Sequence, residues 1–172
     1  LQTENQIKLI AQNIKNSKIA SLARCHPDDI EQAWEAIKVA NDSRIHVFTS
    51  TSEIHMEHML RKSKDEILKD TKESVKYAKK LCEDVEFSAQ DATRTDKDFL
   101  IEVLKTAVEQ GATTINVPDT VGYATPQDYL ELLSQVYEQV KGGNEDVIIS
   151  THCHNDLGSV SYTHLTLPTK QM

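Results

Sequence analysis

The sequence predicts an α/β fold in which parallel strands alternate with helices, and it favours an incomplete (β/α)8 barrel. Five short apolar runs alternate with longer helical segments, which is the pattern of βαβ units and a parallel sheet. Each run passes abruptly into polar, reactive residues, and barrels gather their chemistry at the C-terminal ends of consecutive strands. A complete barrel needs about 250 residues, whereas this chain has 172. We therefore expect part of a barrel, with an open doubly wound sheet as the alternative.

Each predicted strand is a short run rich in Ile, Val, Phe or Thr. The runs are residues 19–23, 45–49, 85–88, 114–117 and 147–150. No G-x-G-x-x-G or P-loop pattern follows any of them, so the usual signature of a nucleotide-binding doubly wound sheet is missing. This absence also favours the barrel.

The predicted helices fill the intervals between these runs. Ser63 and Glu66 have the spacing of a capping box, Gly111 suits a C-cap, and Thr125 followed by Pro126 suits a helix start. The sequence predicts helices over residues 28–40, 64–81, 96–110 and 126–140.

The composition limits the classes of partner and compartment. The chain is 38% hydrophobic and 27% charged, as in ordinary globular proteins, and its formal net charge is −8. This charge argues against nucleic acid, because phosphate binding needs a basic face. No apolar run is long enough to span a bilayer, and Cys25, Cys82 and Cys153 form no C-x-x-C pair. We expect a cytoplasmic protein with reduced thiols.

The most informative segment is His152-Cys153-His154, at the end of the last predicted strand. Residues i and i+2 of a strand share a face, so the two imidazoles are expected to lie about 6 to 7 Å apart on one side. They can then converge on one divalent ion, while Cys153 points the other way and packs. A catalytic metal usually has three protein ligands, so a third would come from another strand.

Four longer motifs, in this order, resemble the 2-isopropylmalate synthase family. They are IHVFTSTSEIH at 45–55, VEFSAQDATRT at 85–95, GATTINVPDTVGY at 111–123 and HCHNDLG at 152–158. The resemblance implies barrel strands three to seven, with residues 1–158 forming a partial catalytic domain of the pyruvate carboxyltransferase type. Residues 159–172 do not continue the pattern, and we interpret them as an artefactual tail.

The resemblance also implies an activity: the metal-dependent condensation of acetyl-CoA with 2-oxoisovalerate, giving 2-isopropylmalate and CoA, the first step of leucine biosynthesis. A full-length parent would be a homodimer. His152 and His154 would bind the metal (Mn, Zn or Mg), and an Arg-Asp pair on the family's first strand, absent here, would supply the third ligand. The residues expected to bind substrate are His55, Ser88, Gln90 and Thr120.

This sequence departs from the family at Gln90, where many members have Glu, so an acid–base role is not expected there. Asp91 and Arg94 are expected either to form an ion pair or to act in catalysis, and His46 and His58 are interpreted as structural.

Two alternatives remain. Homocitrate and citramalate synthases share the barrel and the two histidines. A five-stranded part of a barrel also has open edges and an unfilled interior, so it is expected to be inactive alone and to behave as a non-enzymatic truncated barrel.

Overall fold

The computed structural model describes residues 2–158, and these form a single parallel sheet. The strand order is β1-β2-β3-β4-β5, so each strand pairs with its neighbours along the chain. A doubly wound sheet would reverse its strand order at a switch point. The unbroken order therefore confirms the partial barrel. The strands are β1 (Ile19–Arg24), β2 (Ser43–Ser50), β3 (Val85–Gln90), β4 (Thr114–Asp119) and β5 (Ile148–Cys153).

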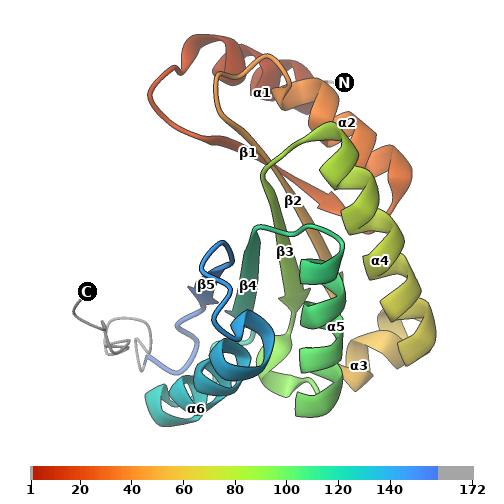
Figure 1. Cartoon of the computed structure of the whole chain (residues 1–172), viewed down its shortest axis with the longest axis vertical. Coiled ribbons are helices and arrows are strands. Elements are labelled where there is room, and N and C mark those ends of the chain that lie inside the picture. The colour runs from red at the N-terminus through yellow and green to blue at the C-terminus, as the bar shows by residue number, and fades with distance from the viewer. Residues whose placement is uncertain (1, 159–172) are drawn as a thin grey trace.

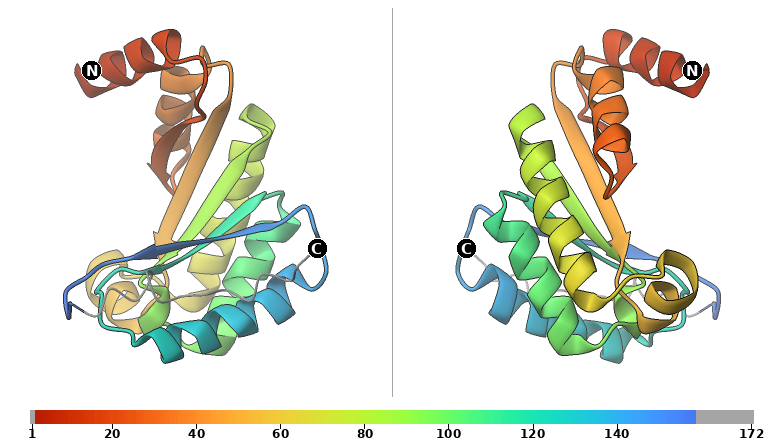
Figure 2. Two further views of the ribbon diagram at one scale, coloured as in Figure 1. Left: turned by 90° about the vertical axis from the view of Figure 1, so that its left-hand side faces the viewer. Right: turned by 90° about the vertical axis from the view of Figure 1, so that its right-hand side faces the viewer.

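Helices cover one face of this curved sheet and leave the other face open (Figure 1). Helix α2 packs against β1 and β2, α4 against β2 and β3, and α5 against β3 and β4. Figure 2 shows the same arrangement from both sides. The helices are α1 (Gln2–Asn13), α2 (Pro27–Ile37), α3 (Glu53–His55), η1 (Met56–Leu60), α4 (Lys64–Leu81), η2 (Ala92–Arg94), α5 (Lys97–Glu109), α6 (Pro126–Val136) and η3 (Tyr137–Lys141).

Helix α4 begins and ends where the sequence predicts, because its capping signals are satisfied. The Ser63 side chain accepts a hydrogen bond from the Glu66 backbone N–H, and the Glu66 carboxylate accepts one from the Ser63 backbone N–H. Thr125 caps α6 in the same way by accepting from the Asp128 N–H. These side chains satisfy amide groups that the first helical turn leaves without partners.

Several predicted boundaries differ from the structure: the helix expected over 28–40 is α2 (Pro27–Ile37), and the strand expected over 45–49 is β2 (Ser43–Ser50). The last strand runs from Ile148 to Cys153 rather than over 147–150, because its pairing with β4 continues to Asp119 opposite Cys153. The helix expected over 126–140 changes after Val136 into the π-helical turn η3. The short helices between Glu53 and Leu60 were not expected at all.

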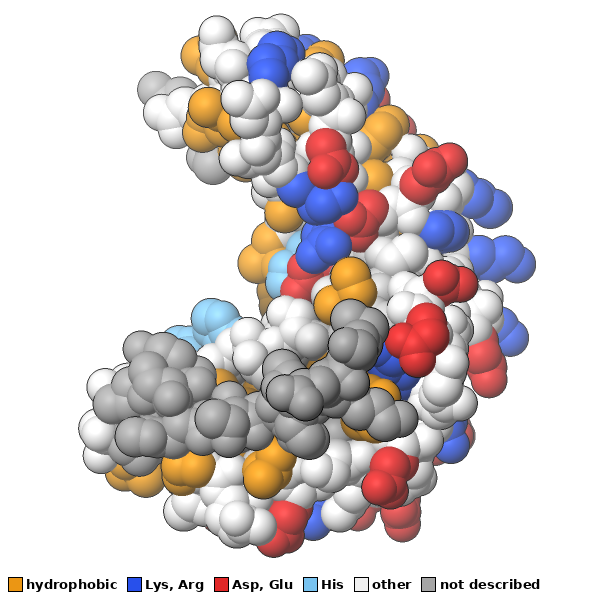
Figure 3. Space-filling model, turned by 60° about the vertical axis from the view of Figure 1, so that its left-hand side comes forward, with side chains coloured by type: hydrophobic (Ala, Val, Ile, Leu, Met, Phe, Trp, Pro, Cys, Tyr) orange, Lys and Arg blue, Asp and Glu red, His pale blue; other side chains and the backbone are white. Residues whose placement is uncertain are grey.

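Strands β1 and β2 alternate between a buried outer face and an open inner face, whereas β4 is buried along its whole length. On β2, Ile45 and Val47 are fully buried against the helices. The alternate residues His46 and Phe48 are only half-buried. The register carries this alternation across the sheet and places His46 opposite Glu86. The outer face builds the core, whereas the inner face carries polar side chains together with exposed apolar ones such as Leu22 and Ile148. Figure 3 shows the hollowed side, with histidine side chains along it.

None of the helices among residues 2–158 combines the length and apolar character that crossing a membrane requires. Residues 159–172, interpreted above as a tail, lie outside the described residues.

Candidate functional site

His152 and His154 lie close together at the C-terminal edge of the sheet. Their ring centroids are 5.0 Å apart, and the ring planes are inclined by 62°. The His154 backbone N–H donates to the Asp119 carbonyl at 3.1 Å, so pairing with the β4 segment extends one residue beyond Cys153. The two imidazoles are therefore held by the sheet and are not on a free loop.

Cys153 lies on the opposite side and packs against the hydrophobic core. Burial raises the pKa of the Cys153 thiol, and a hydrogen bond with Tyr129 partly opposes this rise. A thiol with a raised pKa is a poor metal ligand, because the ligand is the thiolate. This agrees with the interpretation of Cys153 as a packing residue.

Two neighbouring imidazoles at the end of one strand fit part of a divalent-cation site. Among residues 2–158 no group of three or more His, Cys, Asp or Glu side chains is arranged to hold a metal. A catalytic metal usually takes three protein ligands. Within the described residues, His152 and His154 are the two side chains that could belong to such a set.

A hydrogen-bonded network of polar side chains crosses the inner face in the middle of the sheet. Ser88 is buried, and its Oγ lies 2.5 Å from Nε2 of His46 and accepts a 2.7 Å hydrogen bond from Nδ2 of Asn116. Burial lowers the pKa of His46; the charge of Glu86 opposes this effect, while Arg44 and His152 add to it. His46 is therefore held in its neutral form.

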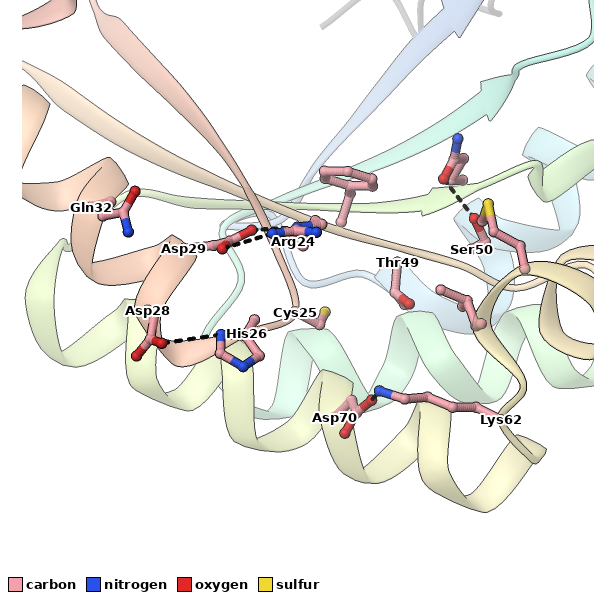
Figure 4. Close-up of a pocket in the computed structure, with 14 residues that line it drawn as sticks. Arg24, Cys25, His26, Asp28, Asp29, Gln32, Thr49, Ser50, Lys62 and Asp70 are labelled. Carbon is pink, nitrogen blue, oxygen red and sulfur yellow. Dashed lines mark hydrogen bonds and ion pairs between the residues drawn. The ribbon is translucent and has the colours of Figure 1, made fainter. Parts of the chain in front are cut away.

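Gln90 ends β3 and accepts a 2.6 Å hydrogen bond from the Ser50 hydroxyl at the end of β2. Both line a cavity of about 880 Å³ that opens at the C-terminal ends of β1 and β2 (Figure 4). Its cations are already paired, Arg24 with Asp29 and Lys62 with Asp70. His152 and His154 do not line this cavity, so the cavity and the imidazole pair are separate features.

His55 and Thr120 meet at Asp91, a fully buried carboxylate with a left-handed backbone (φ 66°). Nδ1 of His55 lies 3.5 Å from the Asp91 carboxylate, and Thr120 Oγ1 accepts a 2.9 Å hydrogen bond from the Asp91 backbone N–H. Ser52 and Arg94 donate to the same carboxylate, with Arg94 at 2.6 Å. The ion pair between Asp91 and Arg94, one of the two expected roles, is therefore present.

The structure thus divides the six predicted site residues into three groups. Ser88 and Gln90 lie on the inner face of β3, His55 and Thr120 meet at Asp91, and His152 pairs with His154. Sequence reasoning left His46 and Asn116 out of the site, although both bond to Ser88. Counting alternate positions along β2 and β4 would have placed both on the inner face.

Five parallel strands in chain order, with polar side chains at their C-terminal edge, define part of a (β/α)8-barrel domain. The chain belongs to the HMGL-like family, which matches residues 2–162.

Within this family the chain is homologous to 2-isopropylmalate synthases. It is 48% identical over 160 residues to the enzyme of Dictyoglomus turgidum, covering 93% of this chain and 32% of that protein. It is 50% identical over 152 residues to the enzyme of Clostridium kluyveri, covering 88% of this chain and 29% of that protein. The chain therefore spans about a third of the length of these relatives.

Solved structures share the fold at low sequence identity. Hydroxymethylglutaryl-CoA lyase from Pseudomonas aeruginosa matches with a TM-score of 0.69 and 18% identity, covering 88% of this chain and 50% of the lyase. An HMG-CoA lyase from Acinetobacter baumannii, in complex with coenzyme A and 3-methylmalate, matches with a TM-score of 0.67 and 17% identity, covering 91% and 53%. This chain corresponds to about half of each lyase chain.

Proposed function

We propose that this chain is part of the catalytic barrel of an acyltransferase that condenses acetyl-CoA with 2-oxoisovalerate, releasing 2-isopropylmalate and CoA. The observation that carries the proposal is the pair of imidazoles, 5.0 Å apart at the catalytic edge of a sheet, in a chain homologous to 2-isopropylmalate synthases. The proposed reaction would belong to leucine biosynthesis in the cytoplasm, and the proposed full-length form is a homodimer.

His152 and His154 would hold the divalent cation, together with a third ligand from outside the described residues. When bound, the cation would act as a Lewis acid and a template for the keto acid. Imidazole ligands suit zinc better than magnesium, and carboxylate or water ligands at the other positions would suit manganese or magnesium.

The other residues of the site would bind and orient the keto acid. Thr120 Oγ1 already accepts the Asp91 N–H, so its own proton remains available to donate to a substrate carboxylate. Ser88 and Gln90 add a hydroxyl and an amide on the inner face of β3. His55 faces Asp91 through Nδ1, which leaves Nε2 as the atom that would contact a substrate.

Acetyl-CoA is the proposed acyl donor. Besides the homology, the proposal is supported by a lyase of the same fold that is in complex with coenzyme A and a small dicarboxylic acid. Homocitrate and citramalate synthases remain the alternatives, since they would differ in the keto acid and not in the imidazole pair.

Ligand-detected NMR with this chain tests the proposal. In the presence of Mn²⁺, the methyl signals of 2-oxoisovalerate should broaden, and H152A and H154A should abolish the broadening. H58A is the matched control, because the His58 side chain is 69% exposed and lies on η1, not on a strand of the sheet. Stronger broadening of 2-oxoglutarate or pyruvate would instead support the homocitrate or citramalate branch. Unchanged broadening in both histidine variants would refute the metal site.

A non-enzymatic truncated barrel is the second candidate for the isolated chain. Leu22 and Ile148 on the inner face are 62% and 56% exposed, and β1 and β5 are each paired on one side only within residues 2–158. We expect no CoA release from acetyl-CoA and 2-oxoisovalerate with added Mn²⁺, and concentration-dependent association in sedimentation velocity. CoA release above background by the pure chain would rule this candidate out.

A further inference from the structure

The turn from Asp119 to Gly122 holds the backbone of His154. The Asp119 carbonyl accepts two hydrogen bonds, one from the Gly122 N–H at 3.3 Å within the turn and one from the His154 N–H at 3.1 Å. One oxygen atom therefore links the turn that follows β4 to the residue that follows β5. The position of the second imidazole depends on the shape of this turn.

The buried side chain of Asp119 fixes this turn through two hydrogen bonds. One carboxylate oxygen accepts the Thr93 hydroxyl at 3.0 Å, and the other accepts the Ala124 N–H at 3.1 Å. One of these partners, Thr93, lies on η2 and the other, Ala124, follows the turn. Because both carboxylate oxygens of Asp119 are bonded, its backbone carbonyl is held in one orientation. It can then serve as a fixed acceptor for His154.

Gly122 is where this turn touches the segment after β5. Its φ is +63°, which side chains rarely adopt. A Cβ at this position would lie 2.8 Å from the His154 carbonyl carbon, 2.8 Å from the Asp156 N and 2.5 Å from an Asp156 carboxylate oxygen. Two of these atoms belong to the backbone, so no side-chain rotation can make room. A side chain here requires the turn and residues 154–156 to move apart.

We propose that Gly122 is a positioning residue for the imidazole pair: the absence of a side chain lets the turn dock on residues 154–156 and sets the ring of His154 beside that of His152. The proposal rests on the proposed function in taking the pair as a metal site. The geometric part, that Gly122 sets the place of His154, holds with or without a metal.

The test compares G122A with G143A in this chain. Gly143 also has a positive φ, +89°, but no atom lies within 4 Å of where its Cβ would be. Both variants therefore carry backbone strain, and only G122A displaces His154. The NMR signals of the histidine rings are assigned with the H152A and H154A variants. Spectra are recorded first without metal and then during a titration of the protein with Zn²⁺. In G122A the His154 signal should shift before metal is added, and Zn²⁺ affinity should fall about 10- to 100-fold, as for other residues that orient ligands. G143A should match the wild type in both readouts.

Equal behaviour of G122A and G143A in both readouts would overturn the proposal. If the wild-type histidine signals do not respond to Zn²⁺, the proposed metal site is refuted. The shift of the His154 signal in metal-free G122A still tests whether Gly122 positions His154. If G122A does not fold, hydrogen exchange of the His154 backbone amide in the wild type tests whether the turn holds this residue. The His154 amide should exchange more slowly than that of unstructured peptide, because Asp119 accepts its hydrogen bond. Exchange at the unstructured rate would show that the turn does not hold His154.

Discussion

The side-chain amide of Asn116 donates a 2.7 Å hydrogen bond to the hydroxyl of Ser88, its register partner on the neighbouring strand. Both residues are buried, and the same hydroxyl contacts His46 at 2.5 Å. Ser88 is thus the central member of a network that joins β2, β3 and β4 on the inner face. Removing its hydroxyl would leave polar atoms on two strands without a partner.

S88A should lower the free energy of unfolding by about 1–3 kcal/mol, the usual cost of leaving a buried donor without an acceptor. Urea denaturation followed by circular dichroism measures the change. S134A is the control, because Ser134 lies on the exposed face of α6 and bonds only to the carbonyl one turn back. Its effect should stay within about 0.5 kcal/mol. Equal losses in the two variants would show that the network adds no stability.

R94M should destabilise the chain much more than R24M. Arg94 pairs with a fully buried Asp91, and removing one partner of a buried pair costs about 3–5 kcal/mol. Arg24 pairs with Asp29 at the surface, where its side chain is 74% exposed and water screens the attraction, so its loss should have little effect on stability. Urea midpoints of the two variants provide the comparison, and similar midpoints would contradict the prediction.

The stability of the chain should decline in acid partly because of Asp84. Burial alone would raise the pKa of this carboxyl, but hydrogen bonds from Arg44, Lys18 and Thr113 outweigh burial and hold the pKa below its ordinary value. A lowered folded-state pKa stabilises the fold above the unfolded pKa of about 3.9, and the benefit is lost as the pH falls through the lower folded-state value.

D84N should therefore be less stable than the wild type at pH 7 and should lose less stability below about pH 4. Unfolding midpoints measured between neutral and acidic pH test this. D146N is the control at an exposed aspartate on the loop before β5, and its pH profile should follow the wild type. A D84N profile parallel to the wild type would refute the assignment.

Cys25 should resist alkylation in the folded chain. Cys25 is only half-buried and lines the cavity, but burial of its thiol raises the pKa to about 12, and a hydrogen bond with Ser74 only partly opposes the rise. The reactive thiolate is therefore scarce at pH 8. Iodoacetamide labelling followed by peptide mass spectrometry should modify Cys25 far more slowly than in urea-unfolded chain. Equal rates in the two states would contradict the prediction.

Elements with strong local signals were predicted well. The helix Lys64–Leu81 was located from a capping box and helical periodicity, and both act within a few residues. The last strand was predicted three residues too short at its C-terminal end. Its end depends on hydrogen bonds to β4, which is distant in sequence from β5. The short helices between Glu53 and Leu60 have no such local signal and were missed.

The order of residues was enough to predict alternating strands and helices, the shared face of His152 and His154, and the family. These follow from periodicity, spacing and motif order, which are properties of nearby residues. The bond of His46 to Ser88, the contact of His55 with the Asp91 carboxylate and the docking of Gly122 on residues 154–156 needed the folded chain. Each of these contacts joins segments that are distant in sequence. Such segments come close together only when the strands have paired in register.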